Sequence, residues 1–90
     1  DGSLIAAQAA DALLSIKGIQ ASFVLADMGE FVMVSGRSLG AVNVQIILER
    51  VGGGGHLTVA GAQLHGMPLD EAVKTLMNSI HAYLKEVEIE

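Results

Sequence analysis

Residues 34–61, VSGRSLGAVNVQIILERVGGGGHLTVAG, contain the features that decide the fold of this chain. Their centre is a run of four glycines, Gly52 to Gly55, followed at once by His56. Glycine loses more backbone freedom on folding than any other residue, so four in a row destabilise a compact domain. Such a run is therefore expected only where the backbone conformation requires glycine. A helical pattern leads into the run and an apolar segment follows, without the serines typical of a flexible linker. The run therefore predicts a loop whose backbone approaches another group closely or adopts positive φ.

The segments before the glycine run predict a helix and then a β-hairpin. Good helix formers with helical apolar spacing occupy residues 4–16, with Ser3 as the expected N-cap and Gly18 as the expected stop. Residues 19–26 and 31–35 are apolar runs separated by a short turn sequence, which predicts two paired strands. The first of these strands is apolar on both faces, and such strands are usually covered on both sides.

The segments around and after the run complete an α/β domain. Residues 42–51 return to helical spacing, with Asn43 at the cap or in the first turn. A third strand is expected around residues 60–64, and residues 69–87 carry the clearest helical pattern of the chain. The prediction is a small mixed β-sheet flanked by helices, in the order α-β-β-α-β-α, with a structured core from about residue 4 to residue 84.

Length and composition limit the function. The 90 residues form one domain, and their opening without methionine is interpreted as a fragment of a larger protein. Five basic against ten acidic residues give a net charge of −5, which excludes the extended basic surface that binds long duplex nucleic acid. A small ligand with one or two phosphates stays feasible. The absence of cysteine excludes disulfides and thiolate metal sites. No apolar run approaches the about 20 residues of a spanning helix, which predicts a cytoplasmic domain.

The candidate ligand-binding residues lie on both sides of the helix expected at residues 42–51. Arg37 has a planar fork suited to phosphate or carboxylate, and Ser38 can donate to the same anion. The glycine amides can form an anion-binding nest, and His56 can contact a phosphate or a base. The structural alternatives are an exposed edge-strand arginine, a turn serine, a close-packed glycine turn and a histidine that fixes the turn. No catalytic arrangement and no metal-ligand spacing is seen, so the residues indicate binding without catalysis.

Three motifs together resemble the DHH-associated C-terminal domain of the DHH phosphoesterases. These motifs are GRSLGAVNVQ at 36–45, ERVGGGGHLTVAGAQL at 49–64 and LDEAVKTLMNSIHAYL at 69–84. The superfamily includes nanoRNA hydrolases, RecJ-type exonucleases and bacterial cyclic-di-AMP phosphodiesterases. The Leu-Thr-Val that follows the histidine makes the chain most similar to the membrane-anchored cyclic-di-AMP phosphodiesterases.

The resemblance implies one part of a manganese-dependent phosphodiesterase that hydrolyses cyclic-di-AMP to pApA. A preceding DHH domain of the same protein would hold the manganese and most catalytic groups, so the chain alone would be inactive. Membrane helices would lie upstream, which would leave this domain on the cytoplasmic side. The implied substrate contacts are phosphate at Arg37 and Ser38, ordering of the site by Asn43, backbone amides at Gly53, Gly54 and Gly55, and phosphate or base at His56.

Two alternative functions stay open. A nanoRNA or pAp phosphatase, or a RecJ-like exonuclease, would contain the same kind of domain. A purely structural or dimerising module would use the apolar helices for self-association and would lack a nucleotide site.

Overall fold

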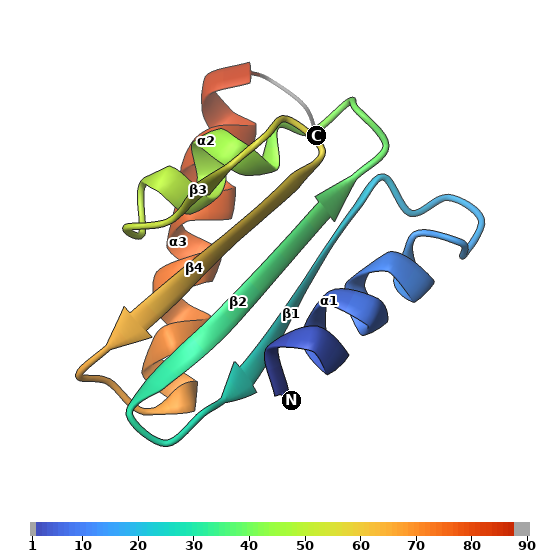
Figure 1. Cartoon of the computed structure of the whole chain (residues 1–90). Coiled ribbons are helices and arrows are strands. Elements are labelled where there is room, and N and C mark those ends of the chain that lie inside the picture. The colour runs from blue at the N-terminus through green and yellow to red at the C-terminus, as the bar shows by residue number, and fades with distance from the viewer. Residues whose placement is uncertain (1, 88–90) are drawn as a thin grey trace.

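The chain folds into one β-sheet with helices on both faces (Figure 1). The computed structural model describes residues 2–87. The predicted α/β class and the order of the main elements are confirmed, with one very short strand, β3, in addition. The elements are α1 (Gly2–Leu13), β1 (Ala21–Asp27), β2 (Phe31–Ser38), α2 (Val44–Glu49), β3 (Gly54–Gly55), β4 (Val59–His65) and α3 (Leu69–Val87).

The four described strands pair in the order β1-β2-β4-β3, and each pair is antiparallel. β1 and β2 form the predicted hairpin, closed by a hydrogen bond of 2.9 Å from the Met28 N–H to the Phe31 carbonyl. β4 begins beside the end of β2, where Arg37 lies opposite Val59. α2 and β3 thus return the chain to the end of the sheet that it left. The described sheet is therefore wholly antiparallel instead of mixed in strand direction.

Strand alternation divides the side chains between two faces of the sheet. On one face Val32, Val34 and Leu64 join the core beneath α2 and α3. On the other face α1 packs on β1 and β2, and the Ser22 hydroxyl donates a 2.7 Å hydrogen bond to the Ala10 carbonyl. Helices therefore cover β1 on both sides, as predicted. Figure 1 shows that α1 lies over the β1 side of the sheet and leaves β4 uncovered on this face.

The helix boundaries follow the predictions only in part. α3 occupies the predicted residues, with Asp70 and Glu71 in its first turn, where negative charge favours the helix dipole. α1 begins at Gly2, so Ser3 lies inside the helix and the predicted N-cap is wrong. α1 ends at Leu13, before the expected stop, because hydrogen bonds to the third preceding residue replace the α-helical pattern there. Within residues 2–87, no helix has the length and apolar character needed to cross a membrane.

Two side chains of α3 hold α2 in position. The buried Ser79 hydroxyl donates a 2.6 Å hydrogen bond to the Ile47 carbonyl of α2. The Tyr83 hydroxyl accepts a 2.9 Å hydrogen bond from the Asn43 N–H, just before α2. Since α2 leads directly into the glycine run, these contacts fix the direction from which the loop starts.

Candidate functional site

The glycine run ends α2 and turns the chain toward β3. The Gly53 N–H donates to the Leu48 carbonyl at 2.8 Å, and the Gly52 N–H donates to the Glu49 carbonyl at 3.1 Å. Gly52 has φ +91°, in the left-handed region. This pair of hydrogen bonds with a left-handed glycine is the Schellman arrangement found at many helix ends. The amides of Gly52 and Gly53 are therefore used within the domain.

Packing requires glycine at positions 53 and 55 but not at position 54. A Cβ on Gly53 would lie 2.1 Å from the Gly61 carbonyl oxygen, and one on Gly55 would lie 2.4 Å from the Val59 carbonyl oxygen. A Cβ on Gly54 would meet no atom within 4 Å. A close-packed turn therefore explains Gly53 and Gly55, whereas nothing in the described part of the domain explains Gly54.

The end of the run is tied to β4. The His56 N–H donates a 2.6 Å hydrogen bond to the Val59 carbonyl, and Gly54 pairs with Gly61. In an antiparallel ladder, hydrogen-bonded pairs alternate with pairs that are not bonded. Gly55, between the two bonded pairs, therefore turns its N–H away from β4. The His56 side chain itself is exposed.

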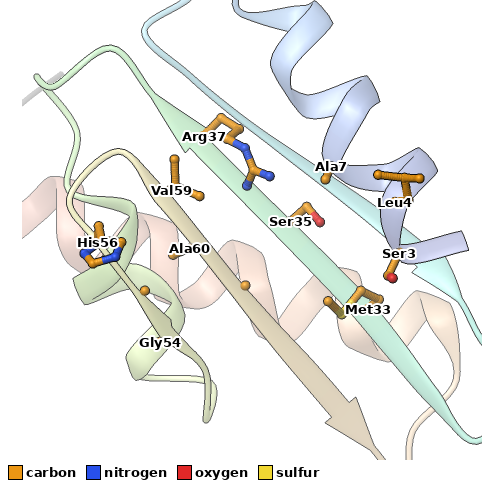
Figure 2. Close-up of a pocket in the computed structure, with 12 residues that line it drawn as sticks. Ser3, Leu4, Ala7, Met33, Ser35, Arg37, Gly54, His56, Val59 and Ala60 are labelled. Atoms are coloured by element: carbon orange, nitrogen blue, oxygen red, sulfur yellow. The ribbon is translucent and has the colours of Figure 1, made fainter.

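An open pocket of about 560 Å³ lies between the start of α1, the uncovered face of β2 and β4, and the glycine run. Figure 2 shows Ser35 and Arg37 on β2, with Gly54 and His56 on the far side of β4. Among the described residues that line the pocket, Arg37 alone carries a permanent charge. A pocket with one permanent cation and a serine hydroxyl beside it favours an anionic ligand.

Arg37 is held in a fixed orientation in this pocket. Its side chain is 14% exposed, and its Nε donates to the Asp11 Oδ1 at 2.9 Å. Its Nη1 donates to the Gly36 carbonyl at 2.8 Å, while its Nη2 makes no hydrogen bond within residues 2–87. The alternative of an exposed edge-strand arginine is wrong, because β2 is an inner strand. A guanidinium fixed on two sides, with a third nitrogen free, suits an oxyanion.

Ser38 and Asn43 do not line this pocket. Ser38 is buried on the core face, and its Oγ accepts a 2.9 Å hydrogen bond from the Gly40 N–H. Asn43 caps α2, as its side chain accepts a 3.2 Å hydrogen bond from the Ile46 N–H. Both residues shape the connection between β2 and α2, so any effect of theirs on a ligand is indirect.

Ser35 lines the pocket, although the sequence analysis did not select it. It lies two residues before Arg37 on β2 and therefore shares its face of the sheet. The residue is only 4% exposed, yet its hydroxyl makes no hydrogen bond with the residues that the structure describes. The two-residue spacing from Arg37 is the signal that could have identified it.

The family of the chain follows from comparison with known proteins. Residues 3–86 match the DHHA1 domain. The chain belongs to the DHHA1 family. This DHHA1 domain is 51% identical over 85 residues to the cyclic-di-AMP phosphodiesterase PdeA of Listeria monocytogenes, covering 93% of the chain and 13% of that protein. The predicted family resemblance is thereby confirmed.

Two further relatives contain similar domains. The DHHA1 domain is 39% identical over 69 residues to the bifunctional oligoribonuclease and PAP phosphatase NrnA of Thermus thermophilus, covering 77% of the chain and 21% of that protein. It superimposes on an exopolyphosphatase-related protein from Bacteroides fragilis with a TM-score of 0.75 and 30% identity, covering 88% of the chain and 23% of that structure. In each case the chain spans less than a quarter of the relative.

The part of the DHHA1 domain that the structure describes does not offer the ligands of a metal centre. Within residues 2–87, no three histidine, aspartate or glutamate side chains lie close enough together to hold a metal ion. A stable metal site needs at least three such ligands with defined geometry. The described residues therefore do not fit manganese.

Proposed function

We propose that this DHHA1 domain recognises the substrate of a phosphodiesterase that hydrolyses cyclic-di-AMP to pApA. The observation that carries the proposal is the anion-favouring pocket around Arg37. The identity of 51% to PdeA, a cyclic-di-AMP phosphodiesterase by name, supports this choice of substrate.

In this proposal a substrate phosphate binds between β2 and the glycine run. The free Nη2 of Arg37 and the hydroxyl of Ser35 donate to it from β2. Gly54 and Gly55 border the pocket from β3, and the bare Cα of Gly54 lets the phosphate come close to the backbone. His56 borders the same pocket and contacts the phosphate or the sugar next to it.

The remaining parts of the enzyme belong to other segments of the full-length protein. A preceding DHH domain would hold manganese, which activates water against a phosphodiester. This chain binds and orients the nucleotide and has no hydrolytic activity alone. We also propose that the full-length protein is membrane-anchored with this domain on the cytoplasmic side.

Paired arginine variants of the full-length protein test the proposal. Arg37 lines the pocket, whereas Arg50 lies outside it and pairs with Glu86 at 2.5 Å. With manganese present, Arg37→Ala should lower kcat/KM for cyclic-di-AMP by about 10- to 150-fold, the value of a hydrogen bond to a charged group. Arg50→Ala should leave kcat/KM unchanged. Equal activity of both variants would contradict a substrate contact at Arg37. It would favour the alternative in which the domain is purely structural.

A second candidate function is hydrolysis of short RNA or pAp. It is favoured by the identity of 39% to NrnA. The pocket is open at its sides, so it admits linear as well as cyclic nucleotides. Turnover of cyclic-di-AMP and of pApA by the full-length protein separates the two functions. Faster turnover of pApA would select the oligoribonuclease.

Self-association is a third proposal and concerns α3. Leu69, Val73 and Met77 lie on this helix and are about 40% exposed. Apolar residues at helical spacing suit contact with a second copy. Sedimentation of the full-length protein, with Val73→Lys and Met77→Lys together as the variant, tests this surface.

A further inference from the structure

A second pocket adjoins the one around Arg37. It has a volume of about 410 Å³ and shares Met33 and Gly61 with the first pocket. Gln63 and His65 of β4 also line it, and both are exposed. None of these residues has a role in the proposed phosphate contacts.

The edge of β4 is unpaired at this second pocket. β3 pairs with β4 only as far as Gly54, opposite Gly61. The hydrogen bond from the His56 N–H to the Val59 carbonyl sets an alternation in which residues 59, 61 and 63 turn their N–H and C=O toward the β3 side. The chain leaves this edge before Gly54 because the Gly53 N–H is bonded to α2. Within the described residues, the outward N–H and C=O of Gln63 therefore have no partner.

One outward N–H beside one outward C=O matches the edge of adenine. Adenine presents its N6 amino donor next to a ring nitrogen acceptor, so each atom meets its complement. Guanine and hypoxanthine carry an oxygen acceptor at position 6 and a hydrogen on N1. These bases would place acceptor against acceptor and donor against donor, which disfavours them.

The surroundings of Gln63 suit a flat base. The centroids of the His65 and Phe31 rings are 5.3 Å apart, and the two ring planes meet at 42°. Phe31 therefore supports the imidazole from one side. Nucleobases stack on such rings, and Met33 supplies an apolar wall. Gly61 lines the phosphate pocket, and Gln63 lies two residues further along β4, at a distance of about 7 Å. This is the scale on which the phosphate and the base of one nucleotide are separated.

We infer that the free edge of β4 at Gln63 is an adenine-recognition site that distinguishes adenine from 6-oxopurines. The inference rests on the proposed function and adds the choice of base to it. The nucleotide phosphate lies at Arg37, and its base lies in the second pocket with its amino group on the Gln63 carbonyl.

The substrate-side test compares cyclic-di-AMP with cyclic-di-IMP. The two differ only in the donor and acceptor at positions 6 and 1 of the base. A good bidentate base contact discriminates by about 5- to 150-fold, so kcat/KM of the full-length protein should favour cyclic-di-AMP by that factor. If neither compound is hydrolysed, the proposed function fails. If both are hydrolysed equally well, that function stands and the adenine site is refuted.

The protein-side test removes the Gln63 N–H with Gln63→Pro. Proline is tolerated on edge strands where the N–H makes no ladder bond, so thermal unfolding should change little. The preference for cyclic-di-AMP over cyclic-di-IMP should fall toward one. Gln63→Ala keeps the N–H and should keep the preference. A Gln63→Pro protein that folds and retains the full preference would refute the site.

His65→Ala provides a variant that leaves the backbone of β4 intact. Loss of base stacking should raise KM for both cyclic dinucleotides by about 5- to 150-fold. Their ratio should not change, because the ring does not read position 6. An unchanged KM would place the base elsewhere and overturn the inference, even if Gln63→Pro failed to fold.

Discussion

The carboxylate of Asp11 accepts a 2.9 Å hydrogen bond from the Nε of Arg37, which joins α1 to β2 at the edge of the pocket. Asp11 is 65% exposed, whereas Arg37 is largely buried. The contact has two opposite effects on a phosphate ligand. It orients the guanidinium, and it cancels part of the positive charge that the ligand meets.

Asp11→Asn separates these two effects. An asparagine oxygen still accepts the Nε hydrogen bond, while the negative charge is gone. We expect KM for cyclic-di-AMP to fall by about two- to fivefold, and the free energy of unfolding to change by less than about 1 kcal/mol, because the hydrogen bond is kept and the carboxylate that loses its charge is exposed. Steady-state kinetics and urea unfolding measure the two. A higher KM would mean that the charge of Asp11 is needed to position Arg37.

Alanine substitutions in the glycine run should separate packing from ligand approach. Gly53→Ala should destabilise the protein by about 1–3 kcal/mol, because its Cβ would overlap the Gly61 carbonyl. Gly54→Ala should change stability by less than about 0.5 kcal/mol, since its Cβ would point into open space. It should still lower kcat/KM for cyclic-di-AMP by about tenfold or more, because a methyl group displaces the phosphate. An active, stable Gly54→Ala protein would remove the glycine run from the site.

Ser35 and Ser38 form a matched pair on opposite faces of β2. Ser35→Ala should raise KM by about 2- to 12-fold, the value of one ordinary hydrogen bond, without loss of stability. Ser38→Ala should leave KM unchanged but destabilise the protein by about 1 kcal/mol, because the half-buried Gly40 N–H loses its acceptor. Calorimetry measures the stability of each variant, and steady-state kinetics measures its KM. A KM effect of Ser38→Ala as large as that of Ser35→Ala would contradict the assignment of faces.

Tyr83→Phe tests the support of the loop from α3. The variant removes the acceptor of the Asn43 N–H and should lower the free energy of unfolding by about 1–3 kcal/mol. Because Asn43 starts α2, amide hydrogen exchange should accelerate in α2 more than in β1. Uniform acceleration across the domain would show that the contact stabilises the whole fold and does not hold α2 in particular.

The sequence predicts most of the fold because the long elements carry clear periodic patterns. Residues 69–87 alternate apolar and polar positions over five helical turns, and the structure places α3 on those residues. β3 has no such signal, since Gly54 and Gly55 have no side chains from which a period could be read. Its pairing depends on the Schellman turn and on the shape of β4, which are tertiary features.

The candidate site could be predicted less completely than the fold. Arg37 and the glycine run stand out by residue type, and the structure brings both to one pocket. Ser38 and Ser35 cannot be distinguished by sequence pattern, because both interrupt an apolar strand. The register with β1 decides between them: Ser35 lies opposite Val24 under α1, whereas Ser38 lies opposite Ala21 and faces the core.

The alternation along β2 has a consequence for how this domain can diverge. Val32 and Val34 hold the core, while Met33, Ser35 and Arg37 line the binding surface. Substitutions at the odd positions can therefore change ligand preference without disturbing the packing that keeps the protein folded. A single-residue insertion would instead exchange the two sets of side chains and destroy both functions at once. Evolution of new specificities on this scaffold should proceed by replacement within β2, and insertions should be confined to the loops.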